Sequence, residues 1–198
     1  MVGVYARKVG DVWFGVAFEG ERIYATGFGS NKESVLQGLR ASVPSNIPFQ
    51  FLKEPSAFVD RVIAVLKEVY DGKDVSQNFV FETKHLSRYT KGIIEAACLI
   101  PPGYVASYGG VADAAGGSPR AVGRVMATNP FAPLCPCHRV VGSDFSLCGY
   151  GGGLDVKLAF LKRERRGHLS KKLVNARSGK LELFPVEFVL DRADKSKC

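Results

Sequence analysis

The chain has 198 residues, of which 46% are hydrophobic, so it can form one large or two modest globular domains. Lysine and arginine number 27 against 19 aspartate and glutamate, which gives a formal net charge of +8. This excess of cations favours a polyanionic partner such as nucleic acid. No apolar run approaches the length of a bilayer span, so we expect no membrane partner.

Cysteine usage indicates a reducing compartment. The chain carries an odd number of cysteines, and residues 1–8 lack the apolar segment of a signal peptide. We therefore expect an intracellular protein, in the cytoplasm or, in a eukaryote, in the nucleus. The cysteines are Cys98, Cys135, Cys137, Cys148 and Cys198.

Residues 1–70 combine β-rich runs with two amphipathic helices. Valine and aromatic residues gather in three runs separated by short glycine-containing turns, a pattern typical of consecutive hairpins. A capping box at Ser30–Glu33 predicts a helix to about Ala41, and apolar residues at helical spacing predict a second helix over Ala57–Tyr70. The predicted strands are Val4–Val9, Val12–Phe18 and Arg22–Phe28.

The pattern becomes mainly helical after residue 85. Pro101 stops the first of these helices, and Ser107 and Ser118 are placed to cap the next two. Pro119 then occupies the first helical position, where proline is favoured. Two short helices joined by a glycine-bearing turn are typical of a helix-turn-helix. The predicted helices are Leu86–Ile100, Tyr108–Ala115 and Pro119–Ala127.

Composition shifts divide the chain further. Polar residues cluster over residues 72–85, and the segment after Gly167 is basic before a strand-like run over Leu181–Leu190. We therefore predict an α+β protein. Its parts are an N-terminal sheet-and-helix domain (residues 1–80), a mainly helical domain (residues 81–167) and a basic C-terminal extension (residues 168–198).

The segment Pro136-Cys137-His138 places a thiol beside an imidazole. Thiolate is the nucleophilic form of cysteine, and an imidazole oriented by a carboxylate can take the thiol proton directly or through water. We nominate Glu164 as that carboxylate. It follows an amphipathic stretch, Asp155–Arg163, that can fold back over the site.

Two other interpretations of these residues stay open. Cys137 is equally consistent with a small, buried apolar residue. The chain also offers thiol and imidazole donors of the type that bind zinc, at Cys135, Cys137, His138 and Cys148. Cys-x-Cys spacing and an adjacent Cys-His pair are unusual for a tetrahedral site, so we expect no metal and no other cofactor.

The predicted helix Pro119–Ala127 has side chains suited to a narrow groove of nucleic acid. Ala121 and Gly123 are small and permit close backbone approach, while Arg120 in the first turn can probe a duplex. Arg124, one turn later, can bind a phosphate. The set favours minor-groove binding with little sequence readout. Small residues are equally typical of tight helix–helix packing, with Arg120 as a solvated charge.

Several motifs occur in one order along residues 86–167. They are Ala106-Ser107-Tyr108, Ser118–Gly123, Asn129-Pro130, Pro136–Val141 and Tyr150–Leu154. In this order they resemble the methylated-DNA–protein-cysteine methyltransferases, also called alkylguanine-DNA alkyltransferases. The element order of residues 1–80 resembles the ribonuclease-H-like N-terminal domain of that family. The resemblance implies such a domain followed by a mainly helical domain with a helix-turn-helix.

The resemblance also implies catalytic roles. Cys137 would accept the alkyl group, with His138 as its water-linked base and Glu164 orienting the imidazole. Tyr108 would help guanine leave as a neutral base, and Asn129 would brace the turn before the active site.

The remaining implied roles concern DNA. Arg120 would fill the gap that the rotated nucleotide leaves in the base stack. The implied DNA contacts are Ser107, Arg120, Ala121, Gly123 and Arg124. The implied base pocket is Val140, Tyr150, Gly151 and Gly152, with Gly151 standing where the family often has serine.

These observations predict a DNA repair protein that acts once. An alkyl group on the guanine oxygen lies inside the duplex, so the nucleotide must flip out before a thiolate can reach it. Displacement gives a thioether, which does not hydrolyse. The predicted partner is double-stranded DNA containing an alkylated guanine, and we expect a monomer. The alternatives are a non-catalytic lesion-binding sensor of the same fold and a cysteine hydrolase that uses Cys137 and His138.

Overall fold

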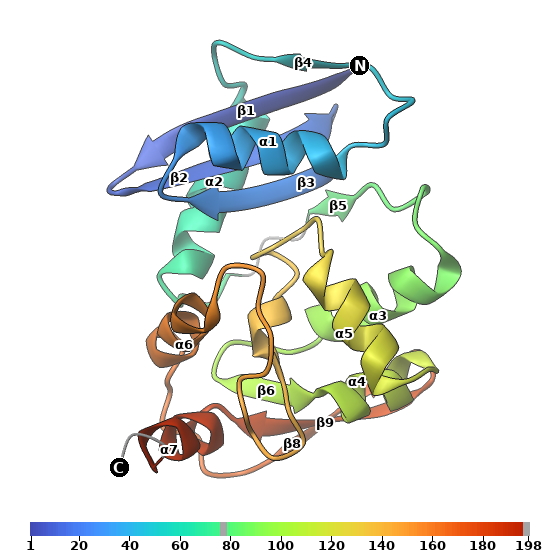
Figure 1. Cartoon of the computed structure of the whole chain (residues 1–198), viewed down its shortest axis with the longest axis vertical. Helices are drawn as coiled ribbons and strands as arrows, with labels where there is room; N and C mark the ends of the chain where they lie inside the picture. The colour runs from blue at the N-terminus through green and yellow to red at the C-terminus, as the bar shows by residue number, and fades with distance from the viewer. Residues whose placement is uncertain (76–78, 196–198) are drawn as a thin grey trace. The chain divides into compact units, whose positions relative to one another are not determined.

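The computed structural model describes residues 1–75 and 79–195 (Figure 1). Parts of the predicted boundary at 72–85 and of the extension 168–198, with Cys198, lie outside the described residues. The fold is α+β, as predicted. The chain forms two compact units. The first comprises Met1–Tyr70, Val75–His85 and Pro130–Leu134, and the second comprises Asp71–Asp74, Leu86–Asn129 and Cys135–Cys198.

Unit 1 is a mixed five-stranded sheet with two helices. The sheet order is β4-β1-β2-β3-β5, in which β1, β2 and β3 form antiparallel hairpins and the short outer strands run parallel to their neighbours. The elements are β1 (Val2–Val9), β2 (Val12–Glu19), β3 (Arg22–Gly29), α1 (Lys32–Ser42), β4 (Phe49–Phe51), α2 (Ala57–Tyr70) and β5 (Val80–Phe81). The three predicted strands and both predicted helices are therefore confirmed.

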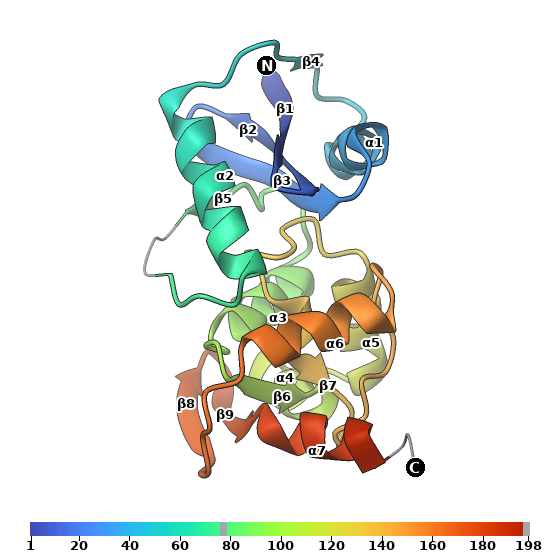
Figure 2. The ribbon, with the colours of Figure 1, turned by 90° about the vertical axis from the view of Figure 1, so that its left-hand side faces the viewer.

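The two helices of unit 1 cover opposite faces of its sheet (Figure 2). Alternate residues of β1, among them Val2 and Val4, are buried with Val35 and Leu39 of α1. A Cβ on Gly15 would lie 2.7 Å from a Leu39 methyl, so the absence of a side chain on β2 lets α1 approach closely.

A segment far along the chain belongs to unit 1. The backbone N–H of Thr26 on β3 donates to the Pro130 carbonyl at 2.8 Å, and its hydroxyl donates to the Ala132 carbonyl at 2.9 Å. The ring of Phe131, fully buried, stacks on Phe81 with centroids 4.3 Å apart. Residues 130–134 thus pack as part of the N-terminal core.

Unit 2 holds the remaining helices and a four-stranded sheet of order β7-β6-β9-β8. Strand β7 is parallel to β6, whereas β9 is antiparallel to both β6 and β8. The elements are α3 (Arg88–Cys98), β6 (Tyr104–Ser107), α4 (Tyr108–Ala115), α5 (Pro119–Ala127), the 3₁₀ turn η1 (Cys137–Arg139), β7 (Val140–Val141), α6 (Leu154–Arg163), β8 (Lys172–Ala176), β9 (Gly179–Pro185) and α7 (Glu187–Lys195).

Side-chain caps start three helices of unit 2, as predicted for two of them. Ser107 Oγ accepts from the N–H of Gly110 at 2.9 Å, and Ser118 Oγ accepts from the N–H of Ala121 at 3.4 Å. Helix α3 begins later than predicted because Ser87 is its N-cap and accepts from Thr90. These bonds satisfy N–H groups that have no partner within a helix.

Two predictions about local structure are wrong. The N-cap of α1 is Asn31, whose side chain accepts from the N–H of Ser34, rather than a capping box begun by Ser30. The predicted strand over Leu181–Leu190 ends at Pro185, and Glu187–Lys195 is a helix. Its buried Val189 and Leu190 join the apolar cluster around Val105, so tertiary packing overrides the strand-like composition.

In the part of the chain that the structure describes, no helix is long and apolar enough to cross a lipid bilayer.

Candidate active site

A pocket of about 600 Å³ opens in unit 2 where α5 faces the loop after β7. It unites predicted residues from four separate segments: Tyr108, Arg120, Gly123, Cys137, Tyr150 and Gly151. The other residues that line the pocket were not predicted from the sequence to do so: Pro119, Met126, Ala127, Cys148 and Gly149.

Cys137 lines this pocket as the first residue of η1. Its side chain is 6% exposed, and its backbone N–H donates to the Cys135 carbonyl at 2.9 Å. The same carbonyl accepts from Asn129 Nδ2 at 2.8 Å, so Asn129 holds the turn that carries the thiol. Burial raises the pKa of Cys137, against hydrogen bonds from Asn129 and Tyr150 and the nearby Lys157 charge, which lower it. The raised pKa favours the thiol form of Cys137 at neutral pH, so a base has to take its proton before the sulfur can act as a nucleophile.

A fully buried carboxylate, Glu164, is bonded to the two residues that follow Cys137 in the sequence, His138 and Arg139. Glu164, the C-cap of α6, accepts from Arg139 through Nε and Nη2 at 2.9–3.2 Å, and its Oε1 lies 2.8 Å from His138 Nε2. Burial raises the pKa of Glu164, but the opposing effects of His138 and Arg139 prevail and lower it to about 2. The carboxylate is therefore ionised at neutral pH.

The ionised Glu164 determines the tautomer of His138. Since the carboxylate only accepts hydrogen bonds, Nε2 carries the hydrogen and Nδ1 keeps its lone pair. Nδ1 is buried and has no hydrogen-bond partner among the described residues. Burial lowers the pKa of His138 despite the raising effect of Glu164, and the ring is held against Phe160 with centroids 4.5 Å apart. Nδ1 is therefore an available base at neutral pH.

A buried lysine, Lys157 of α6, binds the backbone of two segments next to the pocket. Its Nζ donates to the carbonyls of Val140 and Leu147, each at 2.6 Å, and lies 5.8 Å from the Tyr108 ring centroid. Burial lowers the pKa of Lys157 to about 8. The two bonds join β7 to the loop that leads to Tyr150.

Replacing Lys157 with methionine is expected to lower the free energy of unfolding by about 2–4 kcal/mol, because two carbonyls would lose their charged donor. The rate of any reaction at Cys137 should also fall as the Tyr150 loop is released. Urea unfolding measures the first effect. Lys162→Met, on the exposed side of the same helix, is the control and should change stability by less than about 0.5 kcal/mol. Equal effects of the two substitutions would contradict this role of Lys157.

Two tyrosines of the pocket are protonated far above neutral pH. Burial raises the pKa of Tyr108 to about 12, and burial together with the neighbouring Cys137 raises the pKa of Tyr150 further. Each hydroxyl can thus donate a hydrogen to a group in the pocket. A Cβ on Gly152 would lie 3.1 Å from the Tyr150 ring, so this glycine accommodates the tyrosine.

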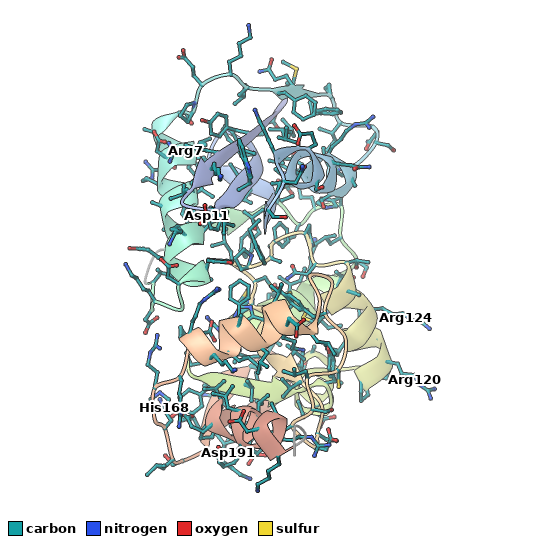
Figure 3. The ribbon with its side chains drawn as sticks, turned by 60° about the vertical axis from the view of Figure 1, so that its left-hand side comes forward. Arg7, Asp11, Arg120, Arg124, His168 and Asp191 are labelled. Carbon is teal, nitrogen blue, oxygen red and sulfur yellow. The ribbon has the colours of Figure 1, made fainter. Side chains whose placement is uncertain are left out.

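The predicted nucleic-acid contacts lie on or next to α5. Arg120 and Arg124 are exposed, and Figure 3 shows both side chains extending outward from the helix. Ala121 and Gly123 lie between them, and the position of a Gly123 Cβ is 4.0 Å from the Tyr108 ring. Ser107 is bonded to the start of α4, and Val140 is buried with its carbonyl bound to Lys157, so neither lines the pocket directly.

The zinc interpretation has no geometric support. Within residues 1–75 and 79–195, no three histidine, cysteine, aspartate or glutamate side chains are grouped as metal ligands. The thiol of Cys135 donates to the Ile94 carbonyl at 3.9 Å, and the neighbouring Cys98 thiol together with burial raises the pKa of Cys135. Cys148 is exposed at the pocket.

Residues 88–166 match the family model described as the DNA-binding domain of 6-O-methylguanine DNA methyltransferase. Over 65 residues the chain is 55% identical to the methylated-DNA–protein-cysteine methyltransferase of Pyrobaculum aerophilum. This alignment covers 33% of this chain and 44% of that protein. The chain thus spans less than half the length of this relative.

Longer alignments cover both units. The methylated-DNA–protein-cysteine methyltransferase of Methanocaldococcus jannaschii is 29% identical over 83% of this chain and 95% of its own length. The crystal structure of Mycobacterium tuberculosis OGT in complex with DNA is similar with a TM-score of 0.66, 26% identity, and coverage of 83% of this chain and 93% of that one.

Proposed function

From its similarity to the methylated-DNA–protein-cysteine methyltransferases, we propose that this chain belongs to that family and repairs alkylated guanine in double-stranded DNA by transferring the alkyl group to its own Cys137. The observation that carries the proposal is a thiol in a 600 Å³ pocket, in sequence next to an imidazole that a buried carboxylate orients. A nucleophile, its base and the group that orients the base are the parts that activated-cysteine chemistry requires.

The reaction is a single displacement. Cys137 Sγ attacks the alkyl carbon, the bond from that carbon to the guanine oxygen breaks, and a thioether forms. The thiol proton passes to His138 Nδ1, directly or through water, and Glu164 stabilises the imidazolium that results. Tyr108 gives its hydroxyl proton to the departing guanine, which leaves as a neutral base, and the proton that His138 took from the thiol returns to Tyr108 through solvent. The thioether is stable in water, so each molecule reacts once.

The DNA partner is engaged by α5. We assign α4 and α5 to a helix-turn-helix, and unit 1 to the ribonuclease-H-like domain of the family. Small residues on α5 suit close approach to the minor groove, and Arg120, at the pocket rim, fills the stack when the damaged nucleotide enters. Tyr150, Gly151 and the segment around Val140 hold the extruded base.

The test is alkyl transfer from a short duplex containing one guanine methylated at its oxygen. Intact-mass measurement and peptide mapping should find one methyl group per protein molecule, on Cys137. A reduced, folded protein that leaves every cysteine unmodified while binding the lesion duplex tightly would instead support the lesion-binding sensor. That alternative has less support here, because a nucleophilic residue lines the pocket.

The pH dependence of the single-turnover transfer rate should follow from the shifted pKa values of Cys137 and His138. Cys137 is a thiol below its raised pKa, and His138 is neutral above its lowered pKa. With saturating duplex, the rate should be flat from neutral pH up to the ordinary pKa of a thiol, and it should fall only at acid pH, below the ordinary pKa of histidine, as His138 becomes protonated. A rate that climbs about tenfold per pH unit across the flat region would contradict proton transfer to His138.

Two remaining expectations accompany the proposal. A cytoplasmic setting suits a reaction that needs reduced thiols. A monomer suffices because the proposed chemistry uses one pocket, and a molecular mass measured by light scattering would test this.

A further inference from the structure

The segment after Gly167 forms an ordered hairpin anchored in unit 2. Strand β9 pairs with β6 through Tyr104 opposite Pro185 and Val105 opposite Phe184, and it pairs with β8 from Gly179 to Leu183. Its Leu181 and Leu183 are fully buried. This hairpin lies beyond the residues that match the family model, and the reaction above gives it no role.

The turn of the hairpin lies against the end of α4 (Figure 1). The N–H of Ser178, in the turn, donates to the carbonyl of Ala114 at 3.1 Å. Ala114 is in the last turn of α4, and the connection that follows leads directly to Ser118, the N-cap of α5, and then to Arg120. The hairpin turn therefore flanks the two helices assigned to the DNA surface.

The side chains at this turn are basic and accessible. Arg177 and Lys180 are exposed on either side of Ser178 and Gly179. The acidic side chains on the adjoining helices are Glu95, 3.6 Å from Arg177, and the exposed Asp113. The Arg177–Glu95 pair is more than half exposed, so water and salt weaken it and Arg177 can exchange this partner for another anion.

We propose that the turn of the β8–β9 hairpin, with Arg177 and Lys180, is an additional contact to the sugar–phosphate backbone of the duplex bound by α5. The inference rests on the proposed function. Continuity with α5 selects duplex DNA as the partner, and guanidinium and ammonium groups are the usual phosphate donors. Because these side chains meet phosphates and not base edges, the contact adds affinity without sequence preference.

The experiment compares two double variants that remove equal charge from opposite ends of the hairpin. Arg177→Ala/Lys180→Ala should weaken binding to undamaged duplex roughly tenfold at low salt and reduce the slope of log affinity against log salt by about 1 to 2. Transfer from saturating lesion duplex should keep its wild-type rate. The matched control is Lys171→Ala/Lys172→Ala at the base of the hairpin, where Lys172 is roughly 13 Å along β8 from Ala176.

The control should change affinity less than about threefold, and both variants should keep the wild-type urea midpoint. Equal weakening by tip and base variants would overturn the proposal in favour of net charge alone, and so would wild-type affinity and salt slope in the tip variant. Each of these outcomes leaves the proposed repair function standing. A wild-type protein that neither binds duplex nor accepts an alkyl group would overturn the proposed function, and this contact with it.

Discussion

Replacing Cys137 with alanine is expected to abolish alkyl transfer, lowering its rate by a factor of about 10⁴ or more. The sulfur is the atom that forms the new bond, and of the two described cysteines that line the pocket, Cys137 is the one followed by a histidine in the sequence. Affinity for lesion duplex should stay within about threefold of wild type, because Cys137 is one of eleven residues that line the pocket. Single-turnover transfer and duplex binding, measured on the same preparations, separate the two quantities.

The control is Cys148→Ala. Cys148 also lines the pocket and is more exposed than Cys137, yet it has no adjacent imidazole in the sequence. This variant should transfer at a rate close to wild type. Loss of transfer in Cys148→Ala, with transfer retained in Cys137→Ala, would show that Cys148 and not Cys137 accepts the alkyl group.

Replacing Glu164 with glutamine should both destabilise the protein and slow transfer. The carboxylate is fully buried and bonded to Arg139 and His138, so its loss leaves a buried guanidinium without its anion. Breaking such a pair costs about 3–5 kcal/mol. Transfer should fall at least about a hundredfold, because His138 loses the acceptor that fixes its tautomer and stabilises its charged form.

The pH dependence of unfolding gives an independent test of Glu164. Its pKa is about 2 in the folded protein against an ordinary 4.5, so its contribution is complete above pH 4.5 and is lost as pH falls towards 2. Wild type should lose roughly 3 kcal/mol more than the variant over this range. Glu182→Gln, which removes a half-exposed partner of Lys171, is the control and should cost less than about 1 kcal/mol. Parallel pH profiles for wild type and Glu164→Gln would contradict the ion pair.

Local signals in the sequence were sufficient for several elements. The bounds of α2, α4 and α5 agree with prediction, because capping serines, an initial proline and terminating glycines mark the ends of these helices. Strands β6 and β7 were missed because they are short and their pairing joins residues far apart in sequence. The predicted carboxylate does reach His138, since α6 places Glu164 on its buried face.

Other parts of the site depend on tertiary packing. Lys157 lies on the same helical face as Phe160, Leu161 and Glu164, and this spacing is visible in the sequence. Lysine side chains are usually exposed, however, so the sequence does not indicate that Lys157 is buried. Only the folded chain provides the two carbonyls that receive its ammonium. Likewise, the raised pKa of Cys137 follows from its burial, which the adjacent histidine does not reveal.

The five residues Pro130–Leu134 pack in the core of unit 1, although the chain on either side of them, Asn129 and Cys135, belongs to unit 2. The protein cannot therefore be divided into independent modules by a single cut near residue 85. A shorter gene product that starts there would carry Phe131 without Phe81, and Pro130 and Ala132 without Thr26. Its new apolar surface would lie a few residues from the nucleophile. We therefore expect the segment that carries Cys137 to fold fully only when residues 1–85 are present in the same chain.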